Sequence, residues 1–338
     1  MSNLFKRAAI FTDLHLGMKS NSAVHNQDCE RYVRWFIDLA KQRDCDLILF
    51  LGDFHHNRNS INISTMDYSL HCLDLIDTCG IRSMFITGNH DLYHKDKRTL
   101  SSVKYIDKFK NIQLVNEQYS EGDVCFVPWL IGEEHKNMRK IKDKYVMGHF
   151  ELPRFLMNAM VEMPDHGELR REDFGYVDKV FTGHFHKRQT QNNIHYIGNA
   201  FPHNFADAWD NDRGAVILDW GMEPEFVNWT DGPEYRVMTL AQLIDNPETF
   251  LNDRTYARVK LDISISYEEA NFIKDTFVKD YNLREMALIP SKRTDIDIDL
   301  APGEVKFESV DQIVLNQIES IDSSSYDRKL LMEIYAGL

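Results

Sequence analysis

Apolar runs alternate with helical patterns in the first third of the chain. Strands are predicted where short apolar runs occur, at 7–13, 46–53 and 82–91. The second run is continuously apolar, as expected for a strand that is covered on both faces. Helices are predicted over 28–43 and about 64–79, and the latter stops where Gly80 can end a helix. This alternation predicts an α/β fold.

The pattern becomes rich in strands after a third predicted helix at about 101–109. Six further apolar segments predict strands, namely NIQLV, DVCFVPWL, KYVMGHF, DKVFTGH, NIHYIGN and RGAVILDW. Helices that are mixed with two sets of strands favour two packed sheets flanked by helices.

Composition and charge narrow the class of protein. At 338 residues and 43% hydrophobic positions, the chain suffices for about two domains of roughly 100–200 residues. No apolar run approaches the roughly 20 residues of a membrane span, and no signal peptide precedes the first predicted strand. The five cysteines contain no C-x-x-C pair, which favours reduced thiols and a cytoplasmic location. The net charge of −14 argues against a simple basic nucleic-acid-binding surface, but it is compatible with bound cations.

Side chains that can bind metal ions follow five of the predicted strands. They are Asp13 with His15, Asp53 with His55 and His56, Asn89 with His90 and Asp91, His149, and His184 with His186. Glycines stand just before four of these groups, where tight turns and close backbone approach are needed. Each motif alone is weak, because two neighbouring histidines often belong to an ordinary surface turn. Five such strand ends in one chain predict a shared metal site at the carboxyl ends of the strands.

The mixture of imidazole, carboxylate and amide ligands indicates the chemistry. Two metal ions about 3.5–4 Å apart clamp the attacking and leaving oxygens of a displacement at phosphorus. Such a centre needs one bridging carboxylate, with nitrogen and oxygen ligands on either side. The donor set suits manganese, iron or zinc, so the pattern predicts two divalent metal ions and phosphoester hydrolysis.

The ordered motifs D-x-H, GD-x-x-H, GNHD, GH and GHFH, over roughly residues 10–190, resemble those of the calcineurin-like metallophosphoesterases. Within that family the chain is most similar to the SbcD-type double-strand-break repair nucleases, especially phage-encoded recombination nuclease subunits. The resemblance implies a four-layer α/β/β/α sandwich with a small α/β capping domain and a C-terminal helical hairpin. It also implies Mn²⁺ as the metal and 3′-to-5′ degradation of DNA by a homodimer, in the host cytoplasm if a phage encodes the chain.

The same resemblance assigns roles to individual residues. It implies that one metal ion is held by Asp13, His15 and His186, that the other is held by Asn89, His149 and His184, and that Asp53 bridges them. His90 matches the family's catalytic histidine, which contacts the phosphate and protonates the leaving oxygen. His56 matches a second phosphate-facing histidine of these nucleases, and His55 is a competing candidate for that role.

One departure from the family pattern bears on the substrate. The protein-phosphatase branch follows its Gly-Asp with a fixed Asp-Arg pair, whereas FHHNR follows Asp53 here. A guanidinium fork grips a phosphomonoester dianion well, so its absence from the matching position favours a phosphodiester substrate. Lys187 and Arg188 can touch DNA phosphates or lie in a solvated turn. Of the remaining histidines, His203 stands near the family's last active-site loop.

The chain is predicted to form three parts. These are a nuclease domain over 1–235, a capping domain that presents DNA over 236–300, and a linker with ATPase-binding helices over 301–338. The capping domain is predicted from strands at 257–264 and 284–290 and from a helix at 266–281. One face of this helix carries Ala270, Ile273 and Phe277 at helical spacing, which predicts that this face is buried.

The C-terminal segment predicts a partner. A polar, acidic stretch over 291–304 precedes two short amphipathic helices, which a capping box at Ser309-x-x-Gln312 and a cap at Ser325 would open. This hairpin packs either on its own domain or on a partner protein. The chain contains no G-x-x-x-x-G-K-[ST] motif, so an ATP-driven step would need another protein. The resemblance implies that the hairpin grips the coiled-coil base of an SbcC-type, SMC-like ATPase.

Three functions from different classes remain open. The leading one is a metal-dependent DNA nuclease, with exonuclease and single-strand endonuclease activity, in an SbcCD-like complex that processes DNA ends in recombination and repair. The second is a phosphatase or a small-molecule phosphodiesterase on the same fold. The third is a non-catalytic scaffold, against which the complete set of metal ligands argues.

Overall fold

The computed structural model describes residues 3–157, 161–263 and 265–290. The chain divides into two units, of which the first comprises Met1–Val237 and Arg254–Tyr256, and the second Met238–Asp253 and Ala257–Leu338. The predicted acidic linker and C-terminal hairpin lie outside the described residues. The roles predicted for a nuclease domain, a capping domain and an ATPase-binding segment stay predictions.

Two six-stranded sheets form the first unit. One has the order β14-β13-β1-β2-β3-β6, with β1 (Arg7–Phe11), β2 (Leu47–Phe50), β3 (Arg82–Ile86), β6 (Ile112–Val115), β13 (Gly214–Asp219) and β14 (Glu225–Asn228). The other has the order β11-β12-β10-β9-β8-β7, with β7 (Tyr119–Glu121), β8 (Val124–Val127), β9 (Tyr145–His149), β10 (Lys179–Gly183), β11 (Gln189–Gln191) and β12 (Ile194–Tyr196). A separate two-stranded ribbon consists of β4 (Leu92–His94) and β5 (Lys97–Ser101).

Parallel pairing brings the ends of several strands together within each sheet. Strands β1, β2, β3 and β6 run parallel, β13 pairs antiparallel with β1, and the edge strand β14 pairs antiparallel with β13. In the other sheet, β8, β9, β10 and β12 run parallel between the antiparallel edge strands β7 and β11. Residues that follow neighbouring parallel strands therefore gather at one edge of their sheet.

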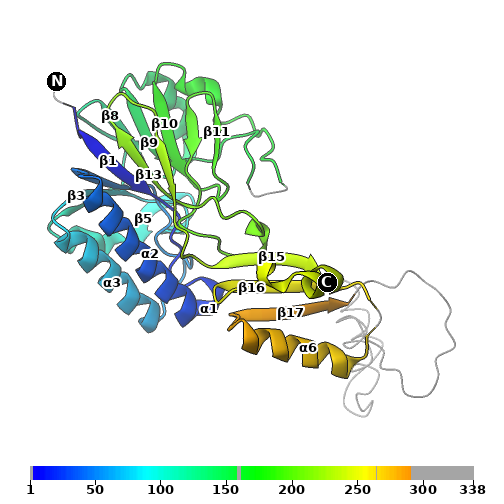
Figure 1. Ribbon diagram of the computed structural model, residues 1–338. Helices are drawn as coiled ribbons and strands as arrows, with labels where there is room; N and C mark the ends of the chain where they lie inside the picture. Colours follow the sequence, from blue (N-terminus) through cyan, green and yellow to red (C-terminus); the bar gives the residue numbers. More distant parts are fainter. Residues whose placement is uncertain (1–2, 158–160, 264, 291–338) are drawn as a thin grey trace, which may run out of the picture. The chain divides into compact units, whose positions relative to one another are not determined.

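Two long helices, α2 (Ala23–Gln42) and α3 (Ile63–Thr78), lie side by side against the sheet that contains β1 and β3 (Figure 1). The Ser22 side chain caps α2 by accepting a hydrogen bond from the backbone N–H of His25. This cap starts the helix five residues before the predicted start at 28. The short α1 (Met18–Asn21) precedes it. As predicted, α3 ends just before Gly80, whose φ of +87° favours glycine.

Alternating residues of each strand pack on opposite faces of the two sheets. On β1, Phe11 packs with the helices, whereas Ile10 packs between the two sheets. On β9, Met147 packs between the sheets, whereas Val146 packs in a third cluster on the outer face. The predicted α/β fold and its two packed, covered sheets are confirmed.

The outer face of the second sheet is covered by loops and short 3₁₀ helices, where the four-layer prediction expected α-helices. These are η2 (Gly132–Lys140) and η3 (Arg171–Phe174), and a further 3₁₀ turn, η4 (Phe205–Asp207), follows β12. The helix predicted at about 101–109 is also a 3₁₀ helix, η1 (Lys104–Lys108). It starts three residues later than predicted, because Ser101 still belongs to β5, where it pairs with Leu92 of β4.

A three-stranded sheet has the order β15-β16-β17, with β15 (Glu234–Thr239), β16 (Thr255–Leu261) and β17 (Glu285–Pro290). Its residues from Met238 in β15 and from Ala257 in β16 onward, and all of β17, belong to the second unit. In the part of the second unit that the structure describes, the helices are α4 (Leu240–Asp245), α5 (Pro247–Phe250) and α6 (Tyr267–Asp280). A capping box between Ser266 and Glu269 opens α6. Ala270 is buried, and Ile273 and Phe277 pack against the core of this unit, as the helical spacing predicted.

The structure bears on the predictions made for membrane-spanning segments and for the cysteines. Among the residues that the structure describes, no helix is both long and apolar enough to cross a membrane. All five cysteines are free thiols, and four of them are buried.

Candidate metal centre

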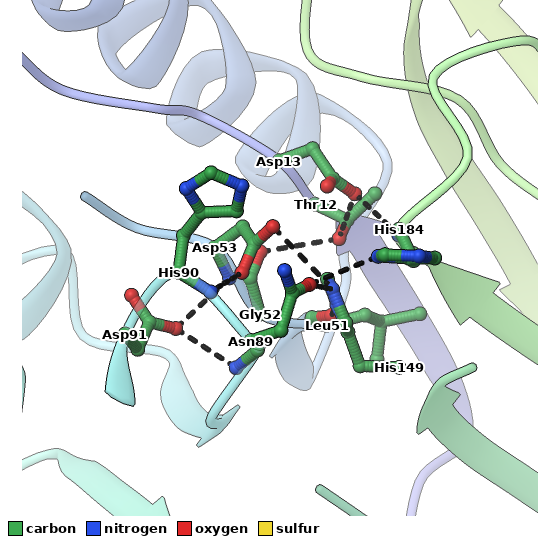
Figure 2. Close-up of polar contacts among 12 residues, drawn as sticks. Thr12, Asp13, Leu51, Gly52, Asp53, Asn89, His90, Asp91, His149 and His184 are labelled. Carbon is green, nitrogen blue, oxygen red and sulfur yellow. Dashed lines mark hydrogen bonds and ion pairs between the residues drawn. The ribbon is translucent and has the colours of Figure 1, made fainter. Parts of the chain in front are cut away.

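Side chains from both sheets converge at the carboxyl ends of parallel strands (Figure 2). Those that follow or end strands β1, β2, β3, β9 and β10 are Asp13, Asp53, Asn89, His149 and His184, respectively. The remaining predicted ligands, His15 and His186, lie two residues after the first and the last of these. The structure therefore brings all seven predicted ligands to one place.

Two glycines allow neighbouring turns of the site to approach each other, Gly88 within one sheet and Gly183 between the two sheets. A Cβ atom on Gly88 would lie 2.2 Å from Asp53 Oδ1, and one on Gly183 would lie 2.2 Å from Thr12 Oγ1 and 2.7 Å from Asp13 Oδ2. These distances are far inside van der Waals contact, so only glycine leaves room for the carboxylates. Gly88 and Gly183, which precede Asn89 and His184, are thus packing requirements of the site.

Four of the predicted ligands have a left-handed backbone conformation. They are Asp13 (φ 51°), His15 (φ 53°), Asp53 (φ 62°) and His184 (φ 87°). Such conformations cost on the order of 1–3 kcal/mol each outside glycine and are concentrated at functional sites. Hydrogen bonds between backbone atoms hold two of them, because Asp13 N donates to Gly52 O at 3.0 Å and His15 N donates to Asp53 O at 3.1 Å.

One group of ligand atoms gathers around Asp13. His15 Nε2 lies 3.2 Å from His186 Nε2 and 3.6 Å from Asp13 Oδ1. His186 Nε2 lies 3.8 Å from the same carboxylate oxygen. Asp13 and His15 are buried, and His186 is partly exposed. These are the three residues that the resemblance assigns to the first metal ion.

A second group gathers around Asn89. His149 Nε2 lies 3.1 Å from Asn89 Oδ1, and His184 Nδ1 lies 2.9 Å from the same oxygen. Figure 2 shows the amide oxygen of Asn89 between the two imidazoles. These three residues are the ones that the resemblance assigns to the second metal ion.

Asp53 connects the two groups. Its Oδ2 lies 3.6 Å from His15 Nε2 in the first group and 3.4 Å from His149 Nε2 in the second. Its Oδ1 accepts a hydrogen bond from the backbone N–H of His90 at 2.8 Å. A carboxylate that faces both groups has the position expected of a bridging ligand.

Contacts behind the predicted ligands orient the imidazoles. His149 Nδ1 donates to Leu51 O at 2.6 Å, so Nε2 is the nitrogen that faces Asp53 and Asn89. His184 Nε2 lies 3.1 Å from Glu151 Oε2, which leaves Nδ1 facing Asn89. A carboxylate or carbonyl on the far nitrogen fixes the tautomer and orientation of metal-binding histidines.

Asp91 ties two of the turns together from behind the site. Its carboxylate accepts backbone hydrogen bonds from Asp53, Phe54 and Gly88, each at 2.9 Å. Burial raises the pKa of Asp91 to about 7, and the charge of Asp53 acts in the same direction. Asp91 therefore serves to position the turns that carry Asp53 and Asn89.

Two imidazoles, those of His15 and His149, lower the pKa values of the two central carboxylates. Burial by itself would raise the pKa of Asp53, but His149 and His15 outweigh it and lower that pKa well below its ordinary value. The pKa of Asp13 is also lowered, because His15 and His149 outweigh its burial. Burial opposes the charge of His149, yet the Asp53 carboxylate raises its pKa to about 9. The two buried carboxylates therefore favour positive charge on the groups that face them.

The neighbouring histidines differ in where they point. His55 is buried away from the ligand groups, with Nδ1 3.1 Å from Ser102 Oγ and Nε2 2.9 Å from Ser69 Oγ. His56 instead reaches the site, where its Nδ1 lies 3.4 Å from His15 Nδ1. Of the two candidates for the second phosphate-facing histidine, the geometry thus favours His56.

The residues fit divalent metal ions. Within the described part of the chain, Asp13 Oδ1 is buried and has no hydrogen-bond partner, although it faces two imidazoles. A buried carboxylate oxygen without a donor is costly unless a cation satisfies it. Asp13, His15 and Asp53 present ligand atoms within 4.8 Å of one another, as do Asp53, His149 and His184. The donors are nitrogen and oxygen atoms, which suit ions such as manganese, iron or zinc.

The positioning roles of Glu151 and Asp91 were not predicted from the sequence, and the roles of Lys187 and Arg188 were left open. Glu151 was not identified, although it stands only two residues after His149, and Asp91 was given no role. Lys187 and Arg188 prove to be engaged within the protein. Lys187 Nζ lies 2.9 Å from Asp210 Oδ2, and Arg188 is partly buried and donates to Ile197 O at 3.4 Å.

The sequence profile of the calcineurin-like phosphoesterase family matches residues 6–188, which is more than half of the chain. The protein therefore belongs to this family of metal-dependent hydrolases. One relative is exonuclease subunit 1 of Enterobacteria phage T4, which is 26% identical over 226 residues. That match covers 64% of this chain and 65% of the relative, so the chain spans less than two thirds of the relative's length.

Solved structures of two kinds of phosphoesterase resemble the chain remotely. A dimetal phosphatase from Danio rerio has a TM-score of 0.41 at 10% identity, and the match covers 63% of this chain and 92% of that one. The nuclease MPE of Pseudomonas putida has a TM-score of 0.32 at 16% identity, over 63% of this chain and 84% of that one.

Proposed function

We propose that the protein is a metal-dependent DNA nuclease that hydrolyses phosphodiester bonds at a centre of two divalent ions. The observation that carries this proposal is the position of Asp53, whose carboxylate faces His15 in one ligand group and His149 in the other. A single structural cation would not need two groups of donors that share one buried carboxylate. The similarity to a phage exonuclease subunit supports DNA as the substrate.

Each ligand group would hold one ion. Asp13, His15 and His186 would bind the first, Asn89, His149 and His184 the second, and Asp53 would contribute to both. Divalent ions in such centres stabilise negative charge on the phosphoryl oxygens. The nitrogen and oxygen donors of the site suit several divalent ions, and among these we propose Mn²⁺, the ion that the family resemblance implies.

Two histidines at the partly exposed side of the site would act on the substrate. His90 donates its Nδ1 proton to His56 O at 2.7 Å, so the proton given to the leaving oxygen would come from Nε2 of the doubly protonated, imidazolium form of the ring. We assign contact with the scissile phosphate to His56, whose ring lies beside that of His90. Both residues are more exposed than Asp13, Asp53 and His149, as groups that meet substrate must be.

A test compares linear duplex DNA, single-stranded DNA and p-nitrophenyl phosphate as substrates, each with Mn²⁺ and with EDTA. We expect DNA cleavage that requires Mn²⁺, with much weaker turnover of the phosphomonoester. Efficient turnover of the monoester with intact DNA would instead favour the phosphatase function. Metal binding without turnover of any substrate would favour a non-catalytic scaffold.

We further propose that the nuclease works as a homodimer with a separate SMC-like ATPase in the processing of DNA ends. The name of the T4 relative, a subunit of an exonuclease, supports a multi-subunit assembly. The test is co-purification with the ATPase, using the full chain and a chain that ends at about residue 303. Equal capture of both forms would contradict docking through the C-terminal helices. A monomeric mass in light scattering would contradict the homodimer.

A further inference from the structure

His203 is a buried histidine whose ring has no polar partner. It lies in the loop after β12, its side chain is inaccessible to solvent, and it follows Phe201 in the sequence GNAFPHN. Among the residues that the structure describes, neither Nδ1 nor Nε2 of His203 has a hydrogen-bond partner. A buried polar group without a partner destabilises the fold, so a ring kept in this state calls for a ligand.

The ring of His203 stands directly beside two of the proposed metal ligands. Its centroid lies 5.5 Å from that of His15 and 5.4 Å from that of His186, and it meets both rings edge-on, at 89° and 83°. One ligand nitrogen from each of the three residues lies within 4.8 Å of the others. Two nitrogens on opposite sides of one ion, with bonds of about 2.1 Å, lie about 4.2 Å apart. The spacing therefore suits a shared cation.

The backbone on both sides of His203 is held in place. His203 N donates to Asp207 Oδ2 at 2.9 Å, and His203 O accepts from Tyr235 Oη at 2.8 Å. Asp207 is in turn paired with the buried Arg213, whose Nη2 lies 3.2 Å from Asp207 Oδ1. The loop is thus anchored at its main chain, while the imidazole itself is left for another partner.

We propose that His203 is an additional nitrogen ligand of the metal ion held by Asp13, His15 and His186. This inference rests on the proposed two-metal site and adds one residue to it. A ring kept only for packing would need no nitrogen atoms. The apolar neighbour Phe201 lies edge-on to the His203 ring, with centroids 5.0 Å apart, and makes no use of them. His25, the other neighbouring histidine, already uses Nε2 on the carbonyl of His15 at 3.0 Å.

The first test replaces His203 with phenylalanine, which keeps the aromatic volume and removes both nitrogens. Mn²⁺ binding is measured by calorimetric titration, and metal content by elemental analysis. We expect affinity for one of the two ions to fall by at least about 10–100-fold, with the other ion retained. His195→Phe is the matched control, since His195 is also buried but bonds Thr190 at 3.0 Å and stacks on Phe181.

A second variant keeps the inference testable if His203→Phe does not fold. In His203→Cys loaded with Co²⁺, direct ligation should produce a thiolate-to-cobalt charge-transfer absorption band that the wild-type protein lacks. Two ions bound by His203→Phe with wild-type affinity, or no such band in folded, Co²⁺-loaded His203→Cys, would overturn the inference and leave the proposed function intact. A wild-type protein that binds no Mn²⁺ would overturn both.

Discussion

The imidazole rings of His56 and His90 lie nearly parallel, 15° apart, with centroids separated by 5.4 Å. The main chain of His56 fixes this arrangement, because its carbonyl accepts the Nδ1 proton of His90 at 2.7 Å. The backbone N–H of His90 meanwhile donates to Asp53 Oδ1. The proposed general acid is therefore oriented by the neighbouring turn and by the central carboxylate, without being one of the proposed metal ligands.

His90→Asn should separate metal binding from catalysis. The asparagine amide can still donate to the His56 carbonyl, and the backbone bond to Asp53 remains, so both metal ions should stay bound. Cleavage of DNA should fall about 10²–10⁴-fold, which is the usual contribution of a positioned proton donor. Metal content and single-turnover cleavage rates are the measurements. Loss of the metal ions in this variant would contradict the division of roles.

Asp53→Asn should abolish both metal binding and activity. The substitution preserves the shape of the side chain but removes the negative charge that faces His15 and His149. Elemental analysis and DNA cleavage with Mn²⁺ measure the outcome. Asp219→Asn is a control, because Asp219 lies at the end of β13, where it pairs with Arg7 away from the site. Full metal content in Asp53→Asn would rule out the bridging role.

Glu151→Gln should weaken the second metal site without emptying the first. Glu151 Oε2 lies 3.1 Å from His184 Nε2 and thereby holds Nδ1 toward Asn89. Removal of a carboxylate behind a metal-bound histidine typically costs about 10–100-fold in metal affinity. The Mn²⁺ dependence of cleavage should shift to higher concentration, with near-normal rates at saturation. An unchanged Mn²⁺ titration would show that Glu151 does not orient the ligand.

Gly183→Ala should damage the site through packing alone. A Cβ at this position would meet Thr12 Oγ1 and Asp13 Oδ2 at 2.2 and 2.7 Å. The carboxylate would have to move, so we expect weaker binding of the first metal ion and a lower thermal unfolding temperature. In the control Gly175→Ala, the nearest atom is Glu172 O at 3.4 Å, which is ordinary contact. Similar metal affinities in both variants would contradict the steric argument.

Most of the fold, and the gathering of the predicted ligands at one place, could be predicted from the sequence alone. Apolar runs identify strands that are buried on both faces, and the polar residues at their ends must meet when the strands are parallel. Asp13, Asp53 and Asn89 follow from this rule because β1, β2 and β3 are neighbours in one sheet. The family resemblance then divided the ligands between two ions, which spacing alone does not do.

Other features depend on tertiary contacts that no local pattern shows. The choice between His55 and His56 is decided by Ser69 and Ser102, which lie far along the chain and take up both nitrogens of His55. The role of Glu151 depends on a contact with His184 across 33 residues. The 3₁₀ layer over the second sheet could not be predicted either, because short 3₁₀ helices carry a weak periodic signal.

The stability of the fold should depend on pH through a histidine outside the site. Burial lowers the pKa of His195 to about 4, and the charge of Lys179 acts in the same direction. Because the unfolded chain has a histidine pKa of about 6.5, it binds this proton first. Stability from the neutral ring is thus fully present above about pH 6.5 and is lost as the pH falls toward about 4.

His195→Gln should therefore flatten the pH dependence of unfolding. The variant keeps a polar group near Thr190 but has no titrating ring, so its stability should decline less between about pH 7 and pH 5 than that of the wild type. Urea unfolding in the presence of EDTA at both pH values measures the difference and removes any contribution from bound metal ions. Other buried histidines, such as His25 with a pKa of about 3, will still contribute a decline of the same sign. Parallel pH profiles for the two proteins would show that His195 is not the source of the effect.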